Sequence, residues 1–194
     1  MRKIAVLFII FLLGAAASVD FYTKLSDAAI ALTAVKVKYD PAYVSIPYPN
    51  GDVASDKGVC TDVVIRAYCK LGIDLQKEVH EDMVAHFDLY PKIWGLKKPD
   101  TSIDHRRVQN LQEFFKRHQA ELKVSKKATD YQVGDLVTWD LGGGVAHIGI
   151  VVDRASAEDP QRHMIVHNIG GGQVLSDCLF KYMITGHYRY RKSG

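Results

Sequence analysis

Hydrophobic residues recur at helical spacing in four stretches of the chain. Within each stretch the apolar positions are separated by three or four residues, which is the pattern of one buried helix face. The pattern predicts helices over residues 21–37, 58–72, 75–89 and 103–118. Between the first two, Pro41, Pro47 and Pro49 rule out a helix and predict an extended, turn-rich segment.

After residue 131 the period of the pattern changes from helix to strand. Four short alternating or apolar runs follow, separated by glycine and aspartate: YQVGDLVTWDL, VAHIGIVVD, HMIVHNI and GHYRYR. They predict an antiparallel meander whose first hairpin loop contains Gly142, Gly143 and Gly144. No predicted helix follows these glycines, so they do not form a phosphate-binding loop. Helices first and strands afterwards predict an α+β fold, with N-terminal helices packed on one face of an antiparallel β-sheet.

Residues 1–17 have the organisation of a cleavable signal peptide. Arg2 and Lys3 precede an apolar run over 4–13, and three alanines at 15–17 offer a cleavage site. The apolar run is short for a membrane span, so we expect no stable membrane anchor after the leader is cleaved. The sequence therefore predicts a periplasmic or secreted protein in which residues 18–194 form a single domain.

The charge of the chain is close to balanced. Losing Arg2 and Lys3 with the leader takes the formal net charge from +3 to +1. This balance gives no basis for nucleic-acid binding, and we expect no nucleic-acid partner and a monomer. The eight histidines and ten tyrosines suit a site built on hydrogen bonds and proton transfer.

Three cysteines leave one without a partner if a disulfide forms. Cys60 and Cys69 are nine residues apart on one predicted helix, about half a turn around it, and cannot bridge while that helix is intact. We expect that Cys69 and Cys178 either form a disulfide or are separate buried thiols, and that Cys60 stays reduced. An exported protein reaches a compartment where disulfides persist.

Cys60 is the candidate nucleophile because it lies in the first turn of the 58–72 helix, on the inward face. The positive end of the helix dipole can lower a cysteine pKa from about 8.5 toward roughly 3.5–7.5. The alternative is that Cys60 is a small buried core residue.

Two histidines on neighbouring predicted strands are the candidate base and its orienting partner. His147 opens HIGIVV, and His167 lies on the next strand, MIVHNI. Adjacent strands are about 4.8 Å apart, so the two imidazoles can come within reach of each other. A cysteine, a histidine and a group that orients the histidine form a recurring nucleophilic arrangement. Asn168 and Asp177 are substitute orienting groups if His167 is a surface residue, and a zinc site formed by Cys60, His147 and His167 is a further alternative.

Charged residues crowd the first turn of the 103–118 helix. Asp104, His105, Arg106 and Arg107 are consecutive. They form either a solvated helix cap or a cluster in which an arginine binds a substrate carboxylate through two hydrogen bonds. We take His105 and Arg106 as candidate substrate-binding residues.

Several motifs resemble known families. The run GDLVTWDLGGGVAHIGIVV followed by MIVH resembles the sheet of NlpC/P60-type cysteine peptidases, over residues 58–72 and 133–168. The motifs GVCTDVVIRAY, IDHRRVQNL and ITGHYRY resemble DUF1287, a family of exported bacterial proteins of unknown function, over most of residues 34–191.

The peptidase resemblance implies a papain-like fold with Cys60 as nucleophile, His147 as base and His167 as orienting residue. It also implies that Tyr48, in IPYPNGD, lines the site. One departure concerns the nucleophile motif: those enzymes usually carry Asp-Cys-Ser-Gly, whereas Cys60 is followed here by Thr61 and Asp62. The departure concerns the substrate preference, and we take Asp62 as a candidate substrate-binding residue.

These observations together predict an exported cysteine hydrolase that cleaves amide bonds, with the stem peptides of peptidoglycan as the expected substrate. The thioester mechanism needs no cofactor and no metal. Two alternatives remain open: an acyltransferase that uses the same thioester, and a non-catalytic cell-wall-binding domain on the same fold.

Overall fold

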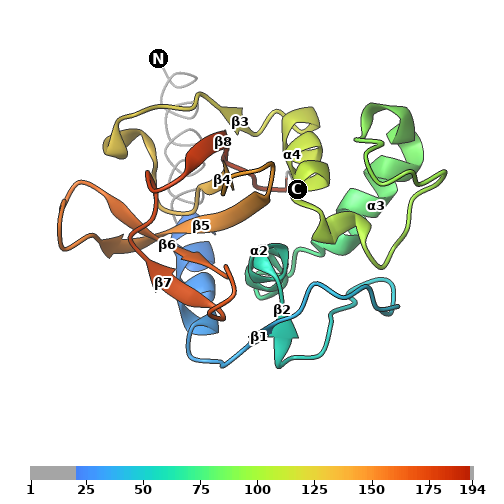
Figure 1. Ribbon diagram of the computed structural model, residues 1–194, viewed down its shortest axis with the longest axis horizontal. Helices are drawn as coiled ribbons and strands as arrows, with labels where there is room; N and C mark the ends of the chain where they lie inside the picture. Colours follow the sequence, from blue (N-terminus) through green and yellow to red (C-terminus); the bar gives the residue numbers. More distant parts are fainter. Residues whose placement is uncertain (1–20, 193–194) are drawn as a thin grey trace, which may run out of the picture.

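The computed structural model describes residues 21–192, so the leader predicted at residues 1–17 lies outside the described residues. Four helices pack against a six-stranded antiparallel sheet, in agreement with the predicted α+β class. In the view of Figure 1 the sheet occupies the left side, α2 (Cys60–Cys69) the centre, and α3 (Leu75–His86) and α4 (Val108–Arg117) the right side. No helix within residues 21–192 is long and apolar enough to cross a membrane.

The helices lie where the apolar pattern predicts them, but each is shorter than its predicted range. The first helix spans residues 21–32 rather than 21–37, and Thr33 turns its hydroxyl back to the Ile30 carbonyl (2.7 Å) where the helix ends. A 3₁₀ turn, η1 (Phe87–Leu89), completes the 75–89 prediction after α3.

The helix predicted over 103–118 is broken in two. The 3₁₀ turn η2 (Asp104–Arg106) is followed by Arg107 in extended conformation, with φ −109° and ψ 120°, and α4 begins at Val108. In an unbroken helix the Asp104 carbonyl would accept from the Val108 N–H. Here it accepts from the Asn110 side-chain amide at 3.0 Å, so a side chain replaces the helical bond.

The sheet contains β3 (Glu121–Leu122), β4 (Leu136–Asp140), β5 (Ala146–Ala155), β6 (His163–His167), β7 (Val174–Ser176) and β8 (Met183–Tyr188), in the order β3-β8-β4-β5-β6-β7. The meander prediction holds for β4, β5 and β6 but is wrong for the last predicted strand, because β8 returns to pair with β4. The short strands β3 and β7 were not predicted. The residues of β4 from Leu136 to Trp139 are all buried, and β8 supplies the second hydrogen-bonded neighbour that such a central strand needs.

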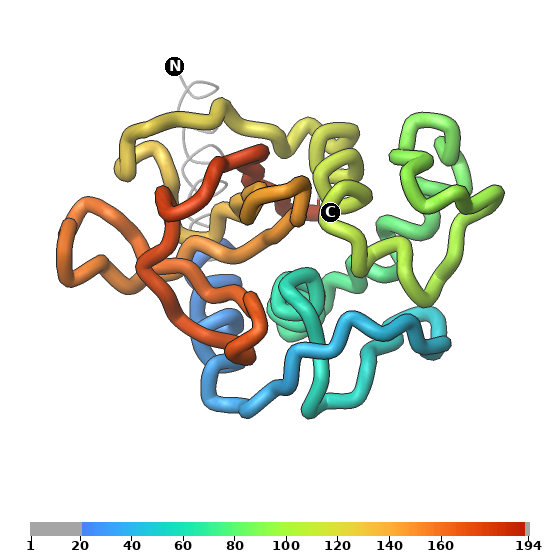
Figure 2. Tube along the Cα trace, viewed as in Figure 1, coloured from blue at the N-terminus to red at the C-terminus, as the bar shows by residue number. Residues whose placement is uncertain are grey.

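A two-stranded parallel ladder, β1 (Lys38–Tyr39) with β2 (Lys57–Gly58), brings the chain to the start of α2. Figure 2 shows the segment between these strands running outward past α2 and returning. Its outer part lies beside the 94–103 loop, where Ser102 Oγ accepts from the Ile46 N–H and Tyr43 donates to Asp100.

The core has two parts, one on each face of the sheet. Ile148, Ile150 and Val152 of β5 belong to the larger cluster with the helices, which also contains Cys60. Val151 belongs to a smaller cluster with Trp139, whose indole N–H donates to the Leu179 carbonyl at 2.9 Å. The alternation of β5 therefore divides its side chains between the two layers.

Gly149, on β5, leaves room for its neighbour on β6. A Cβ at this position would lie 2.6 Å from Ile165 Cγ2 and 3.1 Å from His167 Cβ. We expect Gly149→Ala to lower the free energy of unfolding by roughly 1–3 kcal/mol through overpacking. The matched control is Gly171→Ala, whose Cβ meets nothing within 4 Å. Urea unfolding of both variants checks this, and equal midpoints would contradict it.

Candidate active site

The pairing of β5 with β6 brings two histidines together. Gly149 is paired with His167, and His147 lies two residues before Gly149 on the same side of β5. His147 Nε2 and His167 Nδ1 are 2.8 Å apart, and both side chains are buried. Trp139 covers the His147 ring from the neighbouring strand, with the ring centroids 5.9 Å apart.

The second nitrogen of His167 also has a partner. His167 Nε2 lies 3.6 Å from the thiol sulfur of Cys178, so the contacts run from Cys178 through His167 to His147. Burial lowers the pKa of His147 to about 3 and that of His167 to about 4. Burial also raises the pKa of the Cys178 thiol to about 12, so all three groups are neutral near pH 7.

Cys60 is the first residue of α2 and lies against the start of β5. Its thiol contacts the backbone N–H of Ile148, the residue after His147, and Ala146 lines the same cavity. No hydrogen bond between Cys60 and His147 is found among residues 21–192. The structure thus brings Cys60 to the residues on both sides of His147 but does not join the two side chains.

The prediction that the helix dipole lowers the Cys60 pKa is wrong. Burial raises the pKa of the thiol to about 11, although the N–H groups of Ile148 and Thr61 oppose that shift. Only 6% of the residue is exposed, so the free-energy cost of removing a thiolate from water exceeds the stabilisation that these N–H groups give it.

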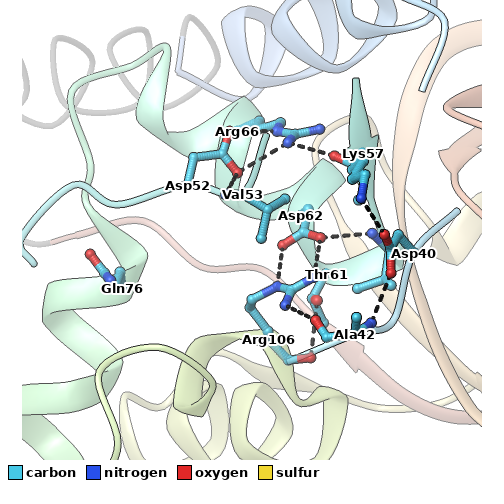
Figure 3. A network of polar contacts seen from close by, with 12 residues as sticks. Asp40, Ala42, Asp52, Val53, Lys57, Thr61, Asp62, Arg66, Gln76 and Arg106 are labelled. Carbon is cyan, nitrogen blue, oxygen red and sulfur yellow. Dashed lines mark hydrogen bonds and ion pairs between the residues drawn. The ribbon is translucent and has the colours of Figure 1, made fainter. Parts of the chain in front are cut away.

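The start of α2 is fixed by Asp62 and Arg106. As Figure 3 shows, the guanidinium donates to both carboxylate oxygens of Asp62, at 2.9 and 3.0 Å. Asp62 also accepts from the Val59 N–H at 2.7 Å, and Thr61 donates to the Arg106 carbonyl at 3.1 Å. Asp62 and Arg106 are therefore occupied with each other and position Cys60 between them and β5.

A second arginine of α2 holds the loop that leads into the helix. Arg66 donates to Asp52 at 2.8 Å and to the Lys57 carbonyl at 2.8 Å (Figure 3). Lys57 in turn pairs with Asp40 at 2.9 Å, so the β1/β2 ladder is tied to α2 through charged side chains.

The other two predicted substrate-binding residues lie away from the thiol. His105 is buried, its Nδ1 has no hydrogen-bond partner, and burial lowers its pKa to about 4. Tyr48 is half-exposed and its ring packs against His80, with centroids 5.2 Å apart.

A cavity of about 240 Å³ opens beside Cys60. Four aromatic or polar residues of its lining were not predicted as site residues: Tyr39, Trp94, Arg107 and Gln109. Arg107 stood next to Arg106 in the charged cluster, which was a usable signal. Nothing in the pattern pointed to Tyr39 or Trp94, because extended and loop segments carry no periodicity that tells which side chains face a cavity.

The three cysteines are all free thiols. Cys178 is buried, as expected for an unpaired thiol, but Cys69 is exposed at the end of α2, which corrects the expectation that it would be buried or bridged. Within residues 21–192, no group of three His, Cys, Asp or Glu side chains is arranged to hold a metal ion. The zinc alternative therefore has no geometric support.

Residues 26–190 match the family described as "Domain of unknown function (DUF1287)". The chain belongs to this family. A relative, the uncharacterized protein YijF of Escherichia coli K12, is 51% identical over 152 residues, which are 78% of this chain and 73% of YijF. The match confirms the DUF1287 resemblance of the sequence motifs.

Two crystal structures of an N-acetylmuramoyl-L-alanine amidase from Bacteroides uniformis are similar to this DUF1287 protein. Their TM-scores are 0.47 and 0.46, both at 13% identity. The first alignment covers 88% of this chain and 99% of the amidase, and the second 86% and 98%. At this degree of likeness no activity is transferred from them.

Removing one partner of the Asp62–Arg106 pair is expected to be costly. Asp62→Asn leaves Arg106 buried without a counter-charge, and we expect a loss of roughly 3–5 kcal/mol of unfolding free energy. Asp52→Asn is the control: Asp52 pairs with Arg66, but its side chain is 43% exposed, so we expect a loss of at most about 1 kcal/mol. Urea unfolding measures both, and similar losses would contradict the assignment.

The raised pKa of Cys60 predicts the pH dependence of its alkylation. Because the thiolate is the reactive form, the rate with iodoacetamide should rise about tenfold per pH unit from about pH 7 to about pH 10. Mass spectrometry of the Cys60 peptide measures this rate separately from Cys69 and Cys178. A rate that is already constant below about pH 8 would mean that the thiol is activated in the resting protein.

Proposed function

We propose that this DUF1287 protein is an exported cysteine hydrolase that cleaves amide bonds. Cys60 is the nucleophile, His147 the base and His167 the residue that orients the base. One observation carries the proposal: His147 of β5 is hydrogen-bonded to the buried His167 of β6, and the backbone N–H of the residue after His147, Ile148, contacts the Cys60 thiol at the start of α2.

The proposed roles correspond to a papain-like, NlpC/P60-type arrangement. The nucleophile begins a helix, the base lies at the start of a central strand, and the orienting residue lies on the adjacent strand. An arrangement of a nucleophile, a general base and a residue that orients the base recurs on unrelated folds.

The hydrogen bond to His167 decides which nitrogen of His147 can act as the base. Nε2 is bonded to His167, so Nδ1 is the atom that accepts the thiol proton. When His147 Nε2–H donates to His167 Nδ1, His167 Nε2–H can donate to the Cys178 sulfur, and the lone pair of His147 Nδ1 is free. Cys178 thereby favours the tautomer that a base requires.

The reaction begins from neutral groups. Because the thiol holds its proton and His147 is unprotonated near pH 7, attack and proton transfer occur together. Cys60 Sγ attacks the amide carbonyl carbon while its proton passes to His147 Nδ1, and backbone N–H groups at the start of α2 stabilise the oxyanion. His147 then protonates the leaving amine as the C–N bond breaks. Water hydrolyses the thioester, which releases the acid and restores the thiol.

Cys60 and His147 must approach each other for this transfer. Catalytic hydrogen bonds are often long or poorly aligned without substrate and tighten in the complex. The thiol contacts the Ile148 N–H, but alternation turns the His147 side chain to the other face of β5, with Trp139 and Val151. The transfer therefore requires the His147 side chain, with the first residues of β5, to turn toward Cys60.

The expected substrate is the stem peptide of peptidoglycan. The predicted leader supports a periplasmic or extracellular location, where cell-wall peptide is the abundant amide polymer. A non-catalytic wall-binding role is the second candidate, because the Cys60 thiol is buried, neutral and not bonded to a base.

Digestion of purified peptidoglycan tests the proposal. We expect the mature protein to release soluble fragments, and Cys60→Ser and His147→Ala to lose nearly all of this activity. His167→Asn should keep partial activity, because its amide oxygen can still accept from the His147 ring.

Chromatography and mass spectrometry of the fragments identify the bond that is cut, and a product joined to an added amine would indicate acyl transfer. Full turnover by Cys60→Ser would overturn the hydrolase proposal. Retained binding to peptidoglycan without any fragments would favour the wall-binding role.

A further inference from the structure

Two adjacent arginines near Cys60 have different surroundings. Arg106 is buried and its charge is balanced by Asp62. Arg107 lines the cavity beside Cys60, and its guanidinium carbon lies 4.1 Å from the centre of the Trp94 ring. Within residues 21–192, no carboxylate lies within ion-pair distance of Arg107. Of the two arginines that line this cavity, Arg107 is therefore the one without a carboxylate partner.

The stacking on Trp94 leaves the donors of Arg107 free. A guanidinium that packs its face on an aromatic ring keeps its N–H groups at the edge, where they can bind a planar anion through two hydrogen bonds. Partial burial lowers the pKa of Arg107, and the charges of Asp104 and Asp100 oppose that shift. A guanidinium stays protonated in proteins, so the cavity contains a partly desolvated positive charge.

The start of α4 adds to the positive potential of the same cavity. Val108 and Gln109, its first two residues, both line the cavity. The first N–H groups of an α-helix have no partner within the helix and carry the positive end of its dipole. No side chain caps α4, and its first turn contains no acidic residue. The start of α2, by contrast, has Asp62 in its first turn.

We propose that this cavity binds a carboxylate of the substrate, held by Arg107 and the start of α4, next to the amide that Cys60 attacks. The inference rests on the proposed function and specifies its substrate class: an acidic peptide whose carboxylate and scissile amide are close enough to share a cavity of about 240 Å³. Gln109 and Tyr39, which line the same cavity, offer neutral hydrogen-bonding groups for the rest of the peptide.

Two alkylating reagents of similar size test the inference without a known substrate. Iodoacetate carries a carboxylate and iodoacetamide is neutral, and both modify the same thiol. The ratio of their rates at Cys60 therefore cancels the effect of the thiol pKa and isolates the preference of the cavity for an anion. Mass spectrometry of the Cys60 peptide gives both rates in the full mature protein.

We expect Arg107→Gln to lower the iodoacetate-to-iodoacetamide ratio at Cys60 about tenfold, as for loss of a charge-assisted hydrogen bond. Lys97→Gln is the matched control, because it removes one positive charge from the same loop as Trp94 at an exposed position outside the cavity lining. Its ratio should stay within about twofold of the wild-type ratio. The iodoacetamide rate of each variant records any change in the reactivity of the thiol itself, and the ratio removes that change from the comparison.

An Arg107→Gln ratio equal to the wild-type ratio would overturn the carboxylate site. An equal fall in both variants would also overturn it, because general surface charge would then be the cause. These outcomes are independent of peptidoglycan digestion. A lower ratio in Arg107→Gln, without release of peptidoglycan fragments by the wild-type protein, would support the anion site and contradict the hydrolase. Release of fragments with an unchanged ratio would support the hydrolase and contradict the anion site.

Discussion

The buried ion pair between Asp62 and Arg106 connects the parts of the molecule that form the site. Asp62 is in the first turn of α2, and Arg106 ends the 3₁₀ turn before α4. Their two hydrogen bonds, with the bond from Thr61 to the Arg106 carbonyl, keep the starts of these two helices side by side. The cavity beside Cys60 is bounded by residues from both starts, so its shape depends on this contact. A buried pair of this kind adds little net stability, but it fixes one arrangement because either charge alone is costly.

Periodicity and turn residues were sufficient to predict the layers of the fold. Four apolar stretches became helices, and the strand runs after residue 131 became an antiparallel sheet in which His147 and His167 meet. The position of β8 could not be predicted, because an alternating pattern says that a strand is half-buried but does not name its neighbour. The break at Arg107 depends on the Asn110 side chain, which a spacing pattern treats as one more polar position.

The site was less predictable than the fold for a physical reason. Residue type and position at a helix start suggested an activated thiol, whereas burial by the surrounding segments raises the Cys60 pKa. Tyr39 and Trp94 reach the cavity from an extended segment and a loop, and their approach depends on tertiary contacts such as the bond between Ile46 and Ser102. Asp62 and Arg106 have the chemistry of substrate-binding groups, but only their mutual distance reveals that they bind each other.

The extended backbone of Arg107 has a consequence for how related chains can diverge. Arg107 separates the 3₁₀ turn that ends at Arg106 from the helix that begins at Val108. Arg106 and Arg107 have different partners although they are adjacent: Arg106 pairs with Asp62, and Arg107 stacks on Trp94. Arg106 neutralises the buried carboxylate of Asp62, whereas Arg107 lines the cavity beside Cys60. Across the DUF1287 family, position 106 is then expected to change only together with position 62. If the cavity binds a carboxylate as proposed, position 107 is expected to vary with the bound group, independently of positions 62 and 106.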